Sequence, residues 1–115
     1  MSMLNWNEYL KQVFAGVAEI GKLSPDVVRG YQTLGGSATK TKLLGPKVNE
    51  LISLAVAVTA RCDGCIAVHT AAAIRAGATR EEIAEALGTA AAVNAGAAIV
   101  YTTRALDAYA TNVER

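Results

Sequence analysis

The sequence predicts an all-α protein, because three features agree. Apolar residues recur at helical spacing, many of them are alanine, and no Asn-Gly or similar pair joins two alternating runs as in a β-hairpin. A chain of 115 residues is most simply one domain, spanning residues 1–115, and it is long enough to bury a core without disulfide staples. We expect a bundle of five or six helices.

Two helices and a loop are expected before residue 45. Apolar residues at positions 10, 13, 14, 17 and 20 mark one face of a helix over about residues 6–21. Ser24 is a candidate N-cap, with Pro25 at the first position of a second helix. The Gly-Gly-Ser at residues 35–37 should end that helix, and a loop should follow to Leu44.

Two further helices are expected around the middle of the chain. Pro46 should open a helix that runs to about Ala60. The next should begin at about Gly64 and stop at Gly77, which is suited to a C-terminal cap.

A capping box marks the start of the following helix. Thr79 and Glu82 have the required spacing, and that helix should run to about Asn94. We expect a turn at residues 94–96, where Asn-Ala-Gly stands, and a last helix over residues 97–112.

The small residues of two of these helices predict assembly. Small side chains let helix backbones approach closely, and apolar residues cover more than one face of the helix at 46–60. A monomer of this length would leave much of that surface uncovered, so we expect a homo-oligomer. The small residues are Ala55, Ala57, Ala60, Ala95, Ala97 and Ala98.

Composition argues against nucleic-acid and membrane functions. The formal net charge is +1 and only 5% of residues are aromatic, so neither a basic stripe nor a stacking platform is expected. Glu8 and Lys11 interrupt the amino-terminal segment, which therefore does not resemble a signal peptide. The longest apolar run, at residues 51–58, is too short to span a bilayer. We expect a cytoplasmic protein.

All of the cysteine and histidine of the chain lies in one stretch, Arg61–His69, which reads RCDGCIAVH. Cys62, Cys65 and His69 have spacings that place them on one face of a helix. Cys62 would stand at the amino end of that helix, where the dipole favours a thiolate. Two cysteines at this spacing can also bond to each other with little backbone movement.

Three interpretations of this stretch compete. The residues could be small buried cysteines beside a core histidine. They could form a metal site, but a complete zinc site needs a fourth ligand, and this helical spacing is unusual for zinc. The third is a dithiol redox centre, which we favour because every Cys and His of the chain gathers there. We assign no metal and no cofactor.

The segment GPKVNELISLAVAVTARCDGCIAVH resembles the AhpD-like alkylhydroperoxidases of the carboxymuconolactone decarboxylase family. The redox signature of these proteins is a Glu, eleven residues, and then C-x-x-C-x-x-x-H. Glu50, Cys62, Cys65 and His69 fall on its four positions. The likeness covers about residues 43–101, since AAAIRAGATREEIAEAL also resembles the continuation in this family.

The resemblance implies an all-helical homo-oligomer, commonly a trimer or hexamer, that acts as a thiol peroxidase on hydroperoxides. It implies that Cys65 attacks the peroxide, that Cys62 resolves the sulfenic acid into a disulfide, and that Glu50 and His69 form a proton relay. A dihydrolipoamide-bearing protein re-reduces the disulfide in the best-known member of the family. A dithiol reductant of that kind is therefore the expected partner.

Three points stay open on the sequence alone. The best-known member has a second histidine directly before the second cysteine, where this chain has Gly64. Position at the helix end would make Cys62, rather than Cys65, the more reactive thiol. A Glu near the start of a helix is often only a favourable partner for the helix dipole. If Glu50 does serve a relay, it should lie within hydrogen-bond reach of His69.

The peroxidase has three alternatives: a general disulfide oxidoreductase, a decarboxylase, and a non-catalytic or metal-binding assembly.

Overall fold

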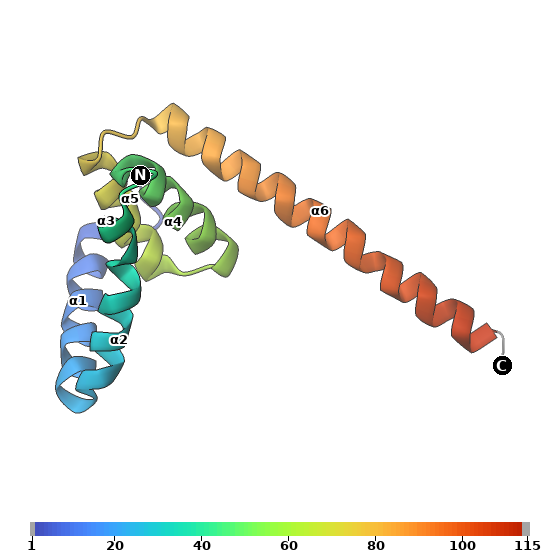
Figure 1. Ribbon diagram of the computed structural model, residues 1–115, viewed down its shortest axis with the longest axis horizontal. Coiled ribbons are helices and arrows are strands. Elements are labelled where there is room, and N and C mark those ends of the chain that lie inside the picture. The colour runs from blue at the N-terminus through green and yellow to red at the C-terminus, as the bar shows by residue number, and fades with distance from the viewer. Residues whose placement is uncertain (1, 114–115) are drawn as a thin grey trace.

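The computed structural model describes residues 2–113, and over that range it contains helices and no strand (Figure 1). The predicted all-α class is confirmed. The helices are α1 (Trp6–Leu23), α2 (Pro25–Gly35), α3 (Ser37–Thr41), α4 (Pro46–Ala60), α5 (Asp63–Arg75) and α6 (Arg80–Val113).

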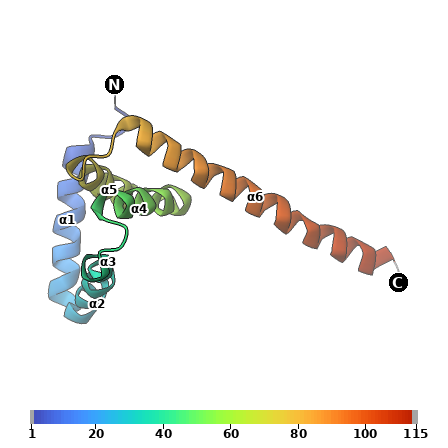
Figure 2. The ribbon, with the colours of Figure 1, turned by 45° about the horizontal axis from the view of Figure 1, so that its top comes forward.

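The first two helices form an antiparallel pair, which both views show side by side (Figures 1 and 2). The side chain of Asn5 caps α1 by accepting a hydrogen bond from the Glu8 N–H at 3.2 Å. Pro25 is the first residue of α2, as predicted. Ser24 is the N-cap residue of α2, as predicted, although its side chain makes no capping hydrogen bond.

The expected loop after residue 37 contains a short helix, α3. Gly36 keeps a right-handed helical conformation, with φ −84° and ψ −5°, so the two glycines do not redirect the chain sharply. The hydroxyl of Thr39 donates to the Gly36 carbonyl at 2.6 Å and steadies the new turn. Lys42 then ends it in the left-handed region, at φ 55°.

The core is small and lies where α4 meets α5. α5 packs between α1 and α4, and α6 packs against the other side of α4. Four residues of the described chain form the buried hydrophobic core: Leu54, Ala57, Ala67 and Ala73. α4 begins at Pro46 and ends at Ala60, as predicted. Arg61 ends it with a left-handed φ of 55°, which reverses the chain within two residues.

The predicted capping box is present at the start of α6, and its Glu82 also connects α6 to α4. The Glu82 N–H donates to the Thr79 hydroxyl at 3.0 Å, and the Thr79 N–H donates to the Glu82 carboxylate at 2.9 Å. The other carboxylate oxygen of Glu82 accepts from Lys47 Nζ at 2.8 Å. This hydrogen bond from Lys47, followed by that from the Thr79 N–H, lowers the pKa of Glu82. The start of α6 is thus tied to the start of α4.

The predicted turn at residues 94–96 is wrong, because α6 continues through it as one helix (Figure 2). A single glycine costs a helix only about 1 kcal/mol, and the alanines around Gly96 favour the helix. The side chain of Asn94 donates to Thr59 Oγ1 on α4 at 2.8 Å and to the Ala90 carbonyl at 2.9 Å. This residue therefore fastens α6 to α4 instead of ending it. Beyond this contact, the helix leaves the rest of the chain (Figure 1).

Candidate redox site

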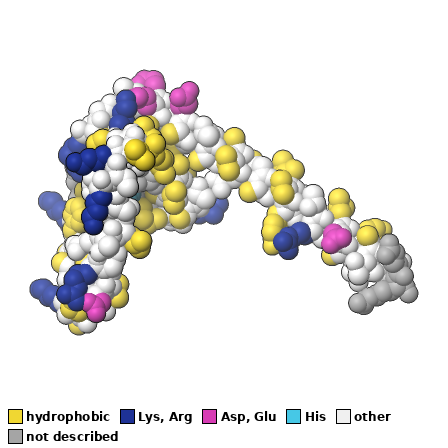
Figure 3. Space-filling view, in the orientation of Figure 1, with side chains coloured by type: hydrophobic (Ala, Val, Ile, Leu, Met, Phe, Trp, Pro, Cys, Tyr) yellow, Lys and Arg dark blue, Asp and Glu magenta, His cyan; other side chains and the backbone are white. Residues whose placement is uncertain are grey.

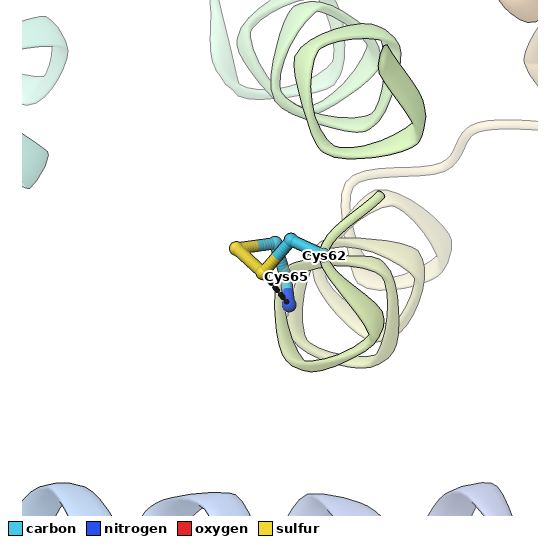
Figure 4. The surroundings of a disulfide bond; sticks show 2 residues. All are labelled: Cys62 and Cys65. Atoms are coloured by element: carbon cyan, nitrogen blue, oxygen red, sulfur yellow. Dashed lines mark hydrogen bonds between the residues drawn. A yellow bond between two sulfur atoms is a disulfide. The ribbon is translucent and has the colours of Figure 1, made fainter. Parts of the chain in front are cut away.

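The two cysteines stand at the amino end of α5 and form a disulfide. Their Cα atoms are 5.2 Å apart, inside the range that a disulfide bridges without backbone movement. Cys62 is the N-cap residue, and its sulfur accepts a hydrogen bond from the Cys65 N–H at 3.1 Å. Figure 4 shows this contact and the two sulfur atoms lying side by side. Both residues are half-buried.

The N-cap position has a consequence for the reduced state. The first N–H groups of a helix lack partners within the helix and carry partial positive charge. The Cys62 sulfur already lies on one of these groups, so a negative charge on that sulfur is stabilised there. By local electrostatics alone, Cys62 is the favoured thiolate.

Glu50 and His69 form the second pair of the site. Glu50 Oε2 of α4 lies 2.7 Å from His69 Nδ1 of α5, so the predicted hydrogen bond is present. The two side chains are 25% and 26% exposed, respectively, which limits competition from water. An ionised carboxylate only accepts hydrogen bonds, so Nδ1 carries the proton and Nε2 is left as an acceptor. A histidine held in this way can take a proton from a thiol.

The structure brings all four predicted site residues to one region. Cys65 and His69 are four residues apart on α5 and thus lie on the same face, one turn from each other. The hydrogen bonds within residues 2–113 join the members inside each pair: Cys65 to Cys62, and His69 to Glu50. The arrangement is a dithiol with a carboxylate-oriented histidine one helical turn further along.

Gly64 lies in contact with α1, a feature that the sequence did not predict. A Cβ atom built at this position would stand 3.4 Å from Cγ2 and 3.6 Å from Cγ1 of Val13. Val13 therefore fills the space in front of the residue that precedes Cys65. A Cβ at position 64 would make ordinary van der Waals contact with Val13, and a longer side chain would have to extend past that residue. Val13 and Gly64 are far apart in the sequence, and no local pattern signals this contact.

The described residues contain no cluster of side chains suited to bind a metal ion. No group of three or more His, Cys, Asp or Glu side chains within residues 2–113 is arranged to hold a metal ion. Arg61, next to the dithiol, has an exposed side chain.

Comparison with known proteins gives a family match and two similar chains. Residues 25–108 match the carboxymuconolactone decarboxylase family. An uncharacterised protein of Haemophilus influenzae is 47% identical over 105 residues, which cover 91% of this chain and 93% of that protein. An uncharacterised protein of Cupriavidus necator is 36% identical over 87 residues, covering 76% of this chain and 77% of that protein.

A solved structure is also similar. The crystal structure of a carboxymuconolactone decarboxylase family protein from Legionella pneumophila superposes with a TM-score of 0.72 at 34% identity. The match covers 89% of this chain and 91% of the Legionella chain.

Proposed function

Because the chain belongs to the carboxymuconolactone decarboxylase family and holds a Cys62–Cys65 disulfide, we propose that it is a thiol-dependent peroxidase that reduces hydroperoxides. The observation that carries the proposal is the placement of the dithiol one helical turn from the His69–Glu50 hydrogen bond. A structural disulfide has no need of an oriented base beside it. The decarboxylase branch of the family lacks the cysteine pair, which favours redox chemistry here.

The reaction begins with a proton transfer. His69 Nε2 takes the proton of the Cys65 thiol, while the Glu50 carboxylate holds Nδ1 and stabilises the imidazolium that forms. The Cys65 thiolate attacks one oxygen of the hydroperoxide, the O–O bond breaks, and Cys65 becomes a sulfenic acid. The alcohol leaves after its oxygen receives the proton from His69.

The second half of the reaction forms the disulfide. The Cys62 thiolate attacks the Cys65 sulfur, and the hydroxyl group leaves as water after protonation. The N-cap position stabilises the thiolate that this step requires. A dithiol then reduces the disulfide by exchange and becomes a disulfide itself, so that one hydroperoxide consumes one dithiol. A protein that bears dihydrolipoamide is the expected donor of this dithiol. The proposed reaction needs no resident cofactor. We place it in the cytoplasm.

The assignment of the two sulfurs is tested by single-turnover reaction with tert-butyl hydroperoxide. Cys65→Ser removes the nucleophile and should consume no peroxide. Cys62→Ser keeps the nucleophile but has no thiol to close the disulfide. It should consume about one peroxide per chain and stop as a sulfenic acid.

Trapping the sulfenic acid with dimedone, followed by mass spectrometry, locates the attacked sulfur. An adduct on Cys62 in the Cys65→Ser protein, with none on Cys65 in the other variant, would reverse the roles and leave the peroxidase intact. An unreactive wild type would refute the peroxidase itself. A wild type that exchanges disulfides but ignores peroxide would identify a general oxidoreductase.

A further inference from the structure

A pocket with a volume of about 250 Å³ lies between α1 and α5. From α1 it is lined by Trp6, Asn7 and Leu10. The α5 wall consists of residues at helical spacing: Ile66, Ala67, Thr70, Ala71 and Ile74. The α1 wall precedes residue 25, where the match to the family begins. One side of the pocket is therefore formed by a segment that the family match does not include.

The pocket is separate from the redox site because it lies across α5 from the dithiol. Successive residues of a helix are turned by about 100°, so Cys65 and His69 lie about 40° apart around the axis of α5. Thr70, Ala67 and Ile74 are turned by about 140–200° from Cys65. A molecule in this pocket would thus lie against the back of the helix that carries the two sulfur atoms.

Trp6 gives the pocket an aromatic wall whose position is fixed. It is the first residue of α1, and the hydrogen bond to the Asn5 side chain holds the start of that helix. Its ring packs edge-on against Tyr9, with 6.5 Å between the centroids and 81° between the planes. On the α5 wall, Ile74 is 63% exposed. Apolar surface on both walls is therefore available to a ligand.

One hydroxyl group in the pocket has no partner within the described chain. Three other threonines in helices, Thr33, Thr59 and Thr89, each donate to the carbonyl four residues earlier. The hydroxyl of Thr70 makes no such bond, nor any other to residues 2–113. No half-buried side-chain oxygen in that range is both sealed from solvent and unbonded, so the Thr70 hydroxyl is accessible from the pocket.

The lining selects a ligand by size and charge. An apolar cavity of about 150 Å³ binds benzene, and pockets for drug-sized molecules begin at about 300 Å³. The volume of about 250 Å³ therefore fits one ring with a short substituent. None of the lining residues is charged, and burial of an unpaired ion is costly, so an ion is excluded. In the view of Figure 3, Lys and Arg side chains lie mainly along the left edge of the molecule.

We propose that this pocket binds a compact, uncharged molecule that consists of one ring, a short apolar substituent and one hydroxyl group. The ring covers the apolar surface of Trp6 and Ile74, and the hydroxyl forms a hydrogen bond with Thr70. Water is a poor occupant of a space whose walls are mainly apolar. A ligand of about nine non-hydrogen atoms should bind with a Kd on the order of 0.1–1 mM. The inference does not rest on the proposed peroxidase.

The single tryptophan of the chain provides a direct measurement of binding. Trp6 gives one indole N–H peak in a ¹H–¹⁵N correlation spectrum of the intact protein, and 4-ethylphenol is the probe. We expect the indole peak to move and to saturate, with a Kd on the order of 0.1–1 mM. The amide peaks of residues 99–113, at the far end of α6, are the internal reference and should stay in place.

Ala71→Leu tests the location of the site by filling the pocket. It should raise the Kd for 4-ethylphenol at least tenfold. Ala18→Leu makes the same change at an exposed position of α1 that does not line the pocket, so its Kd should equal that of the wild type.

Thr70→Val tests the polar contact while preserving the shape of the side chain. It should raise the Kd for 4-ethylphenol about three- to tenfold, the effect of losing one hydrogen bond. Its Kd for ethylbenzene, which lacks the hydroxyl, should not change. Thr103→Val, at an exposed position of α6, is the matched control.

Three results would overturn the proposal. The first is an indole peak that does not move at up to about 10 mM 4-ethylphenol, ten times the upper end of the expected Kd. The second is an unchanged Kd in a folded Ala71→Leu protein, which would place the ligand elsewhere. The third is an unchanged Kd for 4-ethylphenol in Thr70→Val, which would remove the hydroxyl from the ligand's chemistry. This last variant keeps the test valid if Ala71→Leu does not fold.

Discussion

The hydrogen bond between Glu50 and His69 is the contact of the site whose contribution can be estimated most directly. Glu50→Gln keeps the size of the side chain but removes its charge. The Nδ1–Oε2 distance is 2.7 Å and both side chains are about one-quarter exposed. Hydrogen bonds to charged groups contribute about 1.5–3 kcal/mol, and partial exposure favours the lower end. A loss of about 1.5 kcal/mol in the transition state corresponds to a rate about tenfold slower.

The glutamine also permits a second tautomer of the histidine. Its amide can donate to Nδ1, which would move the ring proton to Nε2 and remove the base that faces the thiol. We therefore expect at least a tenfold loss in the rate of peroxide reduction. The pH profile of thiol alkylation should also move to higher pH, because the histidine becomes a weaker base.

The assay is the second-order rate constant for the reduced protein with tert-butyl hydroperoxide, measured beside iodoacetamide alkylation over a pH series. Glu85→Gln is the matched control, since Glu85 is an exposed carboxylate on α6, away from the dithiol. Equal rates and identical alkylation profiles for wild type and Glu50→Gln would refute the relay. Glu50 would then be only an acid near the start of α4.

Three further predictions concern stability. Because the Lys47 hydrogen bond lowers the pKa of Glu82 below its ordinary value of 4.5, this carboxylate stabilises the fold above that value and loses its effect as the pH falls through the lowered pKa. Glu82→Gln should thus lower the Tm at pH 7, and the deficit should shrink as the pH falls below 4.5; a deficit that stays the same down to the acid limit of the folded protein would contradict this linkage. Leu54 is 2% exposed, so Leu54→Ala should lower the free energy of unfolding, measured in urea, by about 3 kcal/mol. A decrease below about 1 kcal/mol would mean that the core relaxes around the smaller side chain. Gly64→His should lower the free energy of unfolding by about 1–3 kcal/mol through contact with Val13, and Val13→Ala should partly restore it. If the shifts of the urea midpoint in the two single variants simply add up in the double variant, the two side chains do not meet.

Local chemistry made much of this protein predictable. Pro46 at the first position of α4 and the capping box of Thr79 and Glu82 act within one helical turn, so their effect can be deduced from neighbouring residues. The placement of Cys62 at the amino end of α5 follows from the same kind of local signal. The hydrogen bond between Glu50 and His69 was expected from the family resemblance, and the packing of α4 against α5 makes it.

The predicted turn at residues 94–96 failed because the conformation of this segment depends on a distant partner. Asn94 and Gly96 look like a turn when only their neighbours are considered, yet Asn94 bonds to Thr59 and the helix continues. Thr59 lies 35 residues away, so no local window includes it.

The sequence by itself therefore determined the helical class and most helix starts, since these follow from backbone propensities and short-range spacing, and it placed both cysteines and the histidine in one stretch. Only the tertiary structure decided that α6 is one helix and that Val13 lies next to Gly64. It also left the outer half of α6 uncovered. The physical reason is that packing between distant segments can outweigh the small free-energy preferences, about 1 kcal/mol, that single residues such as glycine contribute locally.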